Sequence, residues 1–155
     1  MCCCSGTSDI DGMIGDGDHG VNMNKGFTLC REAMDKNPGD LGHGFSVLAK
    51  VLIMKIGGAM GPLYGKLFKS ISEALADVDI IDAGIWGKAL TAAKDSIQII
   101  SQAKAGDKTL VDALFPAVDA YHAAMDAGRD FAGALSEMKN AAEAGTALMR
   151  APMVP

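Results

Sequence analysis

The sequence is poor in aromatic residues, which make up 5% of its 155 positions, and valine and threonine are also sparse. Strands favour β-branched and aromatic residues, so this composition is not typical of a sheet protein. Alanine is abundant instead, and alanine has the highest helix propensity of all residues. The composition therefore favours an all-α fold.

Charged residues are few as well, at 21%, and the net charge is −5. Nucleic-acid affinity comes mainly from lysine and arginine that neutralise phosphates, so we expect no nucleic-acid partner. The longest apolar stretch, residues 47–60, is interrupted by Lys50 and Lys55. No segment approaches the about 20 apolar residues that cross a bilayer, so we expect no membrane span.

Only four cysteines are present, and three of them are the consecutive Cys2, Cys3 and Cys4. This spacing, with Cys30 as the fourth, fits neither a zinc site nor a disulfide framework. The N-terminus also lacks a basic start followed by a sustained apolar run, which a secretory signal would have. These absences predict a protein of the reducing cytoplasm.

Apolar residues recur with a helical period along most of the chain. Trp86, Leu90, Ala93, Ile97 and Ile100 are separated by four, three, four and three residues, which places them on one face of a helix. The same reasoning predicts helices over residues 22–36, 48–56, 61–78, 86–100, 110–125 and 131–142. We therefore predict a single domain over residues 1–155, built as an antiparallel bundle of about six helices.

Three carboxylates, Asp11, Asp16 and Asp18, fall within eight residues and alternate with glycines. Like-charged carboxylates crowd together at low cost only around a cation, and Mg²⁺ and Ca²⁺ prefer oxygen ligands. The segment runs into a helix predicted to start near Asn22, whose N-terminus would favour phosphate. An alternative is a turn in which Asp18 or Asn22 caps the helix and His19 is a hydrogen-bonded loop residue.

Two further segments combine glycine with turn-forming residues. Residues 57–65, Gly-Gly-Ala-Met-Gly-Pro-Leu-Tyr-Gly, lie between two predicted helices, where glycines allow either a close ligand or tight helix packing. Residues 105–112, Ala-Gly-Asp-Lys-Thr-Leu-Val-Asp, precede the fifth predicted helix, which Thr109 or Asp107 would cap. Residues 57–65 are not a Walker loop.

Together the three segments resemble the L subunit family of the phosphotransferase-dependent dihydroxyacetone kinases. They are also similar to the nucleotide-binding domain of the single-chain ATP-dependent dihydroxyacetone kinases. In this family an aspartate precedes a Gly-Asp-x-Asp-His-Gly-x-Asn-Met loop, which Asp11, Asp16, Asp18, His19 and Asn22 match in order. The resemblance extends over about residues 11–145.

The resemblance implies an α-helical barrel whose mouth binds ADP or ATP through two Mg²⁺ ions. Asp11, Asp16 and Asp18 would be the metal ligands. No catalytic side chain is implied, because phosphoryl transfer depends mainly on positioning and charge neutralisation. The residues implied to contact the nucleotide are His19, Gly20, Val21, Asn22, Ala59, Met60, Ser101 and Leu110.

The resemblance also implies a phosphotransferase activity in glycerol metabolism. In the family a separate K subunit holds dihydroxyacetone or a related ketose, and the nucleotide on the L subunit carries the phosphoryl group to it. In the phosphotransferase-linked type, which His19 and Asn24 resemble, an M subunit recharges the bound nucleotide.

Two departures from the family pattern are visible. Met60 stands where the family usually has a small hydroxyl residue, and the family continues with helices beyond both ends of the match. We therefore expect a truncated subunit with exposed apolar surface, a tendency to self-associate and impaired activity. The alternatives are a remnant or interaction module of the same fold that has lost nucleotide binding, and a free-standing metal-binding helical protein.

Overall fold

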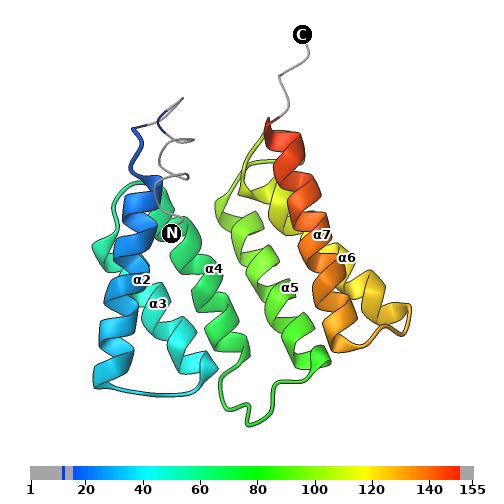
Figure 1. Ribbon diagram of the computed structural model, residues 1–155, viewed down its shortest axis with the longest axis horizontal. Helices are drawn as coiled ribbons and strands as arrows, with labels where there is room; N and C mark the ends of the chain where they lie inside the picture. Colours follow the sequence, from blue (N-terminus) through cyan, green and yellow to red (C-terminus); the bar gives the residue numbers. More distant parts are fainter. Residues whose placement is uncertain (1–11, 13–15, 151–155) are drawn as a thin grey trace. The chain divides into compact units, whose positions relative to one another are not determined.

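The computed structural model describes residue 12 and residues 16–150, and within that part of the chain it contains six helices and no strand (Figure 1). The expectation of an all-α fold with about six helices is therefore confirmed. The helices are α2 (His19–Lys36), α3 (Leu41–Lys55), α4 (Met60–Ala74), α5 (Ala83–Ile100), α6 (Leu110–Asp126) and α7 (Phe131–Arg150).

Several helices are longer than their apolar patterns predict, and one is shorter. α2 begins at His19 rather than near Asn22, α5 begins at Ala83 rather than at Trp86, and α7 continues to Arg150, whereas α4 ends at Ala74 rather than near Val78. α3 begins at Leu41, seven residues before the predicted start, because Asp40 caps it by accepting a hydrogen bond from the backbone N–H of His43 at 2.7 Å.

The chain divides into two compact units, residues 1–73 and 74–155. The expectation of a single domain stays a prediction. No helix in the described part of the chain is long and apolar enough to cross a membrane.

In the first unit α2 and α3 run antiparallel. The thiol of Cys30 lies 3.9 Å from the carbonyl oxygen of Gly44, and Gly26 lies against Leu52 further along the pair. A Cβ at Gly26 would be only 2.7 Å from Leu52 Cδ2, so this glycine sets the close approach of the two helices. The core of the unit consists of Leu48, Leu52 and Ile56, with Cys30, Met60, Tyr64 and Phe68 packed against them.

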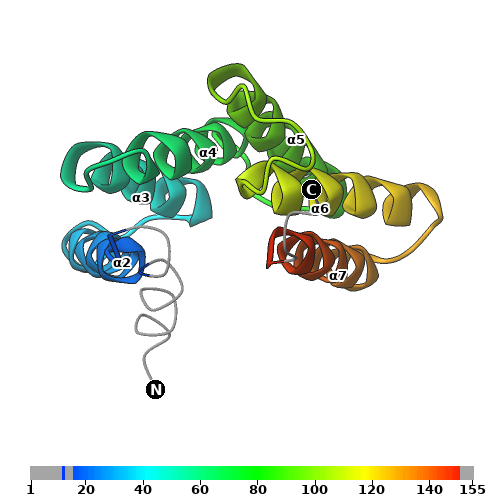
Figure 2. The ribbon, with the colours of Figure 1, turned by 90° about the horizontal axis from the view of Figure 1, so that it is seen from above.

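In the second unit α6 lies between α5 and α7 in sequence and contacts both, and α6 and α7 are side by side in both views (Figures 1 and 2). The buried core includes Leu90, Val118, Tyr121, Ala124 and Ala134. The Tyr121 ring is fully buried, and its hydroxyl donates a 2.7 Å hydrogen bond to the carbonyl oxygen of Ala83. Tyr121 therefore links the middle of α6 to the start of α5.

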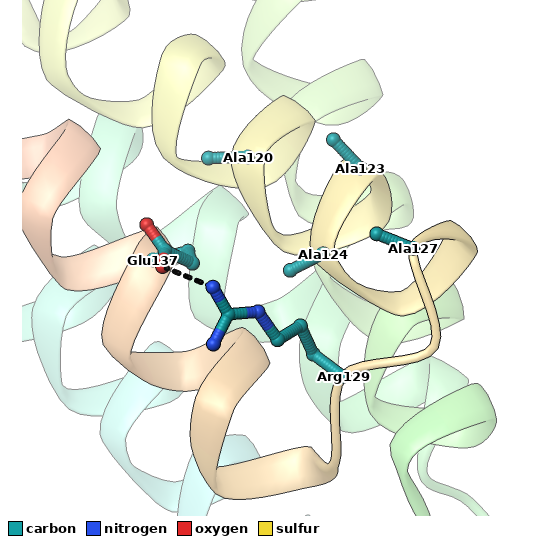
Figure 3. A pocket seen from close by; sticks show the side chains of 6 residues that line it. All are labelled: Ala120, Ala123, Ala124, Ala127, Arg129 and Glu137. Carbon is teal, nitrogen blue, oxygen red and sulfur yellow. Dashed lines mark ion pairs between the residues drawn. The ribbon is translucent and has the colours of Figure 1, made fainter.

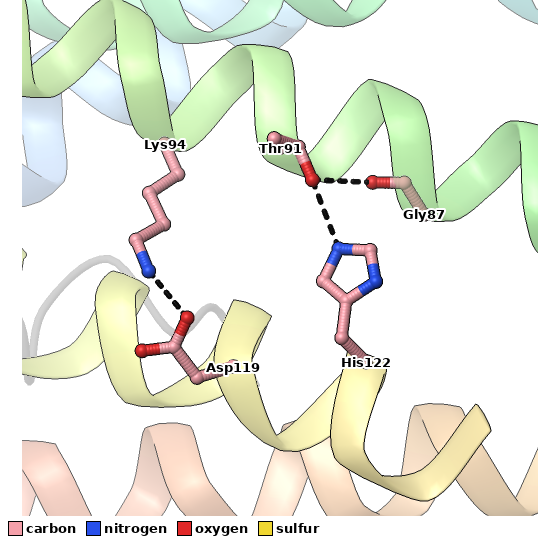
Figure 4. Close-up of polar contacts among 5 residues, drawn as sticks. All are labelled: Gly87, Thr91, Lys94, Asp119 and His122. Atoms are coloured by element: carbon pink, nitrogen blue, oxygen red, sulfur yellow. Dashed lines mark hydrogen bonds and ion pairs between the residues drawn. The ribbon is translucent and has the colours of Figure 1, made fainter. Parts of the chain in front are cut away.

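Polar contacts join α5 to α6 (Figure 4). The Thr91 hydroxyl donates to the carbonyl oxygen of Gly87 at 3.1 Å. His122 Nε2 lies 2.9 Å from Thr91 Oγ1. Because the only hydroxyl hydrogen of Thr91 is used for Gly87, the Nε2–H of His122 is the donor to Thr91. Lys94 pairs with Asp119 in the next turn. These contacts fix the register of the two helices.

Several large apolar side chains are exposed, among them Val21, Met54, Ile80 and Ile99. Exposed apolar surface was expected from the sequence. The expected self-association stays a prediction.

Candidate functional site

The aspartate-rich segment leads into α2 as a tight, hydrogen-bonded turn. The backbone N–H of Asp18 donates to Asp16 Oδ1 at 3.3 Å, and Gly17 between them has a φ of 74°. Asn22 Nδ2, one turn into the helix, donates to Asp18 Oδ2 at 2.6 Å. Asp16 and Asp18 are both exposed, whereas Asp11 lies outside the described residues.

The geometry of Asp18 argues against the alternative in which it only caps a helix. Asp18 occupies the N-cap position of α2, but its side chain accepts no capping hydrogen bond, and its φ and ψ of −92° and −9° are helical. Asp40 and Asp82 have extended backbones and do cap α3 and α5, each through a 2.7 Å bond. Asn22 lies inside α2 and is not a cap either. The carboxylate of Asp18 accepts a hydrogen bond from the Asn22 side chain instead of from a backbone N–H of the first helical turn.

Oxygen donors are what a hard divalent cation requires, and Asp16 and Asp18 supply them at the end of α2 where the helix dipole is positive. Within the described residues no group of three or more histidine, cysteine, aspartate or glutamate side chains gathers around one point. The donor set fits Mg²⁺ in chemistry, and its completion by Asp11 stays a prediction.

The first turn of α2 also carries the other predicted residues of this segment. Gly20 is buried, Asn22 is half-buried and Val21 is 62% exposed. The His19 ring lies edge-on to the Tyr64 ring of α4, with a distance of 6.1 Å between ring centroids and an interplanar angle of 73°. The structure therefore brings the first segment against the second, although 45 positions separate the two residues.

Ala59 and Met60, the predicted residues of the second segment, lie at the start of α4. The glycines of this segment have two different roles. A Cβ at Gly61 would collide with the backbone carbonyl oxygens of Ile56 and Leu52, and one at Gly65 would collide with Ile53. Both glycines therefore serve helix packing, as the alternative interpretation of this segment held.

Gly57 and Gly58 are different, because nothing lies within 4 Å of a Cβ built on either one. Gly58 has a φ of 69°, a left-handed conformation that glycine adopts readily, so its backbone conformation explains why a glycine stands there. Gly57 is exposed and has no such φ, so neither packing nor conformation accounts for it. An open, uncrowded backbone at this point allows the close approach of a ligand.

The third segment is a hydrogen-bonded loop between α5 and α6, in the second unit. Ser101 is the C-cap residue of α5 and its Oγ accepts from the N–H of Ala103 at 3.2 Å, whereas Leu110 is the first residue of α6. Thr109 caps α6, as one of the two sequence alternatives held. The other candidate, Asp107, accepts from the N–H of Lys104 instead.

Sequence reasoning did not identify the residue that organises this loop, which is Asp112. Its Oδ1 accepts from the N–H of Gly106 at 2.5 Å and its Oδ2 accepts from the N–H of Thr109 at 3.0 Å. The hydrogen bonds from Gly106, Thr109 and Lys108 hold the pKa of the Asp112 carboxyl below its ordinary value. The signal in the sequence was the spacing Thr-x-x-Asp, which is a capping box with aspartate in the place of the usual glutamate.

The loop contains two left-handed residues, Gly106 with a φ of 97° and Lys108 with a φ of 57°. For a lysine this conformation costs about 1 kcal/mol, and it persists only where the surroundings hold it. A pocket of about 380 Å³ borders the loop and is lined by Ala105, Gly106, Lys108, Asp112, Pro116 and Met149.

Another pocket, of about 310 Å³, lies where α6 turns into α7 (Figure 3). It is lined by Ala120, Ala123, Ala124, Ala127, Arg129 and Glu137. Arg129 and Glu137 form a 3.8 Å ion pair between exposed side chains, which contributes little to binding or stability. No predicted site residue lines this pocket, so we assign no function to it.

Comparison with known proteins identifies a family and several relatives. The sequence model of the DAK2 domain family matches residues 13–150. A protein of Listeria innocua named PEP-dependent dihydroxyacetone kinase 1, ADP-binding subunit DhaL, is 40% identical over 116 residues, which cover 74% of this chain and 58% of that protein. The PTS-dependent dihydroxyacetone kinase, ADP-binding subunit DhaL, of Lactococcus lactis is 39% identical over 110 residues, covering 68% of this chain and 53% of that protein.

A D-erythrulose kinase of Mycolicibacterium smegmatis is 33% identical over 111 residues, which cover 69% of this chain but only 19% of that larger protein. The aligned part of the chain thus spans little more than half the length of the two DhaL relatives.

Proposed function

The chain belongs to the DAK2 domain family, and on this premise we propose that it is a nucleotide-binding subunit of a dihydroxyacetone-type kinase. It would hold ADP or ATP together with Mg²⁺ and pass a phosphoryl group to dihydroxyacetone or a related ketose. The similarity to ADP-binding subunits of two dihydroxyacetone kinases supports this reading, and the similarity to an erythrulose kinase supports the wider ketose class.

The contact between His19 and Tyr64 is the observation that carries the proposal. It joins the aspartate-rich segment to the start of α4, so that the residues proposed to bind metal and those proposed to bind phosphate lie on neighbouring helix ends. Both ends are N-terminal, and helix N-termini favour anions. Gly57, three residues before α4, adds uncrowded backbone.

Asp16 and Asp18 would hold Mg²⁺ together with Asp11, and Asn22 keeps the Asp18 carboxylate turned away from the helix-capping position. Bound Mg²⁺ neutralises phosphate charge and orients the phosphoryl group for transfer. Gly20, Val21, Ala59 and Met60 then provide the backbone surface against the phosphates, with Ser101 and Leu110 assigned to the base. No side chain of this chain has to act as a nucleophile.

The proposed partners are a K subunit, which would hold the ketose, and an M subunit, which would recharge the nucleotide. The names of the relatives, which describe subunits of larger kinases, support a partner of this kind. The cysteine pattern supports a setting in the reducing cytoplasm.

Calorimetric titration with ADP, in the presence and absence of Mg²⁺, tests the proposal. We expect binding that depends on Mg²⁺, and we expect Asp16→Asn to weaken it about tenfold or more, since one ligand charge is lost while the shape is kept. Asp35→Asn makes the same change at the other end of α2 and is the control, expected to bind like the parent.

Metal binding without ADP binding would favour a free-standing metal protein, and equal affinity of Asp16→Asn and the parent would overturn the metal assignment. A parent that binds ADP with Mg²⁺ is then mixed with a K subunit of this family and dihydroxyacetone. Formation of the phosphorylated ketose would support the kinase activity, and its absence would favour the interaction-module alternative.

A further inference from the structure

The loop between α5 and α6 is held by side-chain hydrogen bonds, and Asp112 accepts two of them. Residues 104–107 are exposed, and the loop borders an open pocket. Asp112 nevertheless fixes its second half at two points, since its two carboxylate oxygens accept from the N–H groups of Gly106 and Thr109. A loop in this state keeps its shape before any ligand binds.

The shape that Asp112 maintains is a strained one. The left-handed backbone of Lys108 lies between the two residues that Asp112 binds, and a lysine adopts this conformation only when neighbouring contacts hold it. Strained backbone of this kind gathers at ligand-binding sites more often than elsewhere. The capping box of Thr109 and Asp112 accounts for the bond from the Thr109 N–H, but it does not require the second bond from the Gly106 N–H or the left-handed backbone of Lys108.

The two ends of the loop are the residues that the proposed function assigns to the base. Ser101 is the C-cap of α5 and Leu110 begins α6. Between them, the Asp107 side chain accepts from the Lys104 N–H, and the Asp112 side chain accepts from the N–H groups of Gly106 and Thr109. Loss of the Asp112 contacts would release the chain at Gly106 and Thr109, between the two helices.

We propose that Asp112 is a positioning residue for nucleotide binding: it pre-forms the loop of residues 101–109 and so sets the affinity for the adenosine part of the nucleotide. This inference rests on the proposed function. The inference divides the nucleotide affinity into two parts. The metal and phosphate contacts are proposed for Asp16, Asp18 and the start of α4, whereas Asp112 affects only the adenosine part, through the loop.

The test compares the binding of Mg²⁺–ADP with that of Mg²⁺–pyrophosphate, which lacks the adenosine. We expect Asp112→Asn to weaken ADP binding about fivefold to tenfold and to change pyrophosphate binding less than about twofold, because only the pre-formed adenosine contact is lost. Asp112→Glu keeps the favoured residue of a capping box while displacing the carboxylate from Gly106, so it should show the same selective loss with less effect on folding.

Thr109→Ala is the matched control. It removes the helix cap at Val111 but leaves the backbone N–H groups that bind Asp112 in place. We expect Thr109→Ala to lower the melting temperature while leaving the ratio of ADP to pyrophosphate affinity unchanged. The inference is overturned if Asp112→Asn weakens both ligands equally, if it changes neither, or if Thr109→Ala shifts the ratio to the same extent. A parent chain that fails to bind Mg²⁺–ADP overturns the proposed function instead.

Discussion

The imidazole ring of His19 lies edge-on against the phenol ring of Tyr64, with 6.1 Å between the ring centroids. Tyr64 itself packs against the core formed by Leu48, Leu52 and Ile56, and burial raises the pKa of its hydroxyl. The ring of Tyr64 is thus anchored, whereas His19 is the first residue of its helix. Through this contact, the first residue of α2 packs against a side chain that is itself held by the core.

We therefore predict that Tyr64→Leu weakens Mg²⁺–ADP binding about threefold to tenfold, because an aromatic pair contributes about 0.5–1.5 kcal/mol beyond its buried area. Tyr64→Phe keeps the ring and should bind like the parent. Calorimetric titration measures the affinities, and the imidazole signals of His19 in a proton NMR spectrum report its environment. A Tyr64→Phe variant as weak as Tyr64→Leu would show that the hydroxyl, not the ring, is the important group.

Two glycines of one segment should respond in opposite ways to the same substitution. Gly61→Ala should destabilise the protein by about 1–3 kcal/mol, because the new Cβ meets two backbone carbonyl oxygens that cannot move aside. Gly57→Ala meets no atom within 4 Å, so it should leave the stability unchanged or raise it by about 0.4–1 kcal/mol.

If ligand phosphates approach the backbone at Gly57, the same Gly57→Ala variant should bind Mg²⁺–ADP more weakly than the parent. Urea denaturation and calorimetry on the two variants measure both quantities. Unchanged ADP affinity in a stable Gly57→Ala protein would remove Gly57 from the proposed site.

The sequence predicts most of this fold because the helical period of apolar residues is visible wherever the buried face of a helix consists of large side chains. The pattern from Trp86 to Ile100 identified α5, although its first three residues were missed. The pattern failed at the start of α3, where Gly42 and Gly44 have low helix propensity and their place in a helix depends on packing against α2 and on the cap by Asp40. It failed again in α7, where Gly145 continues the helix because a bare backbone can approach Asp112 of α6.

The site was predicted by residue type but not by conformation. The run from Asp16 to Asn22 was recognised as chemically unusual, yet nothing in the residue order reveals that Asp18 binds Asn22 instead of capping α2. Asp112 was missed for a similar reason. Its partners are backbone N–H groups that converge on it only because Lys108 adopts a left-handed conformation, which lysine seldom does.

Tyr121→Phe should destabilise the second unit by about 1 kcal/mol. The hydroxyl of this fully buried residue donates to the carbonyl oxygen of Ala83 at 2.7 Å, and its loss leaves that oxygen with one fewer partner inside the protein. Urea denaturation measures the change. Tyr121→Leu, which also removes much of the ring, should cost about 3 kcal/mol or more, so equal losses for the two variants would assign no role to the hydroxyl.

The contribution of Asp112 to stability should depend on pH in a defined direction. Its pKa in the folded protein is lowered from an ordinary value of 3.8, first of all by the hydrogen bond from Gly106 and then by that from Thr109. A carboxyl whose pKa falls on folding stabilises the folded state most when it is ionised in both states. This stabilisation is therefore fully present above the ordinary pKa and is lost as the pH falls through the lowered value.

Denaturation of the parent and of Asp112→Asn over a series of pH values measures this contribution as the difference between the two free energies of unfolding. We expect the parent to be the more stable at neutral pH, and the difference to shrink as the pH falls below about 4, since the parent then loses its carboxylate while the asparagine does not titrate. Thr109→Ala removes an uncharged cap from the same helix end, so its difference from the parent should stay constant with pH. Two parallel curves for the parent and Asp112→Asn would mean that the carboxylate charge does not hold the loop.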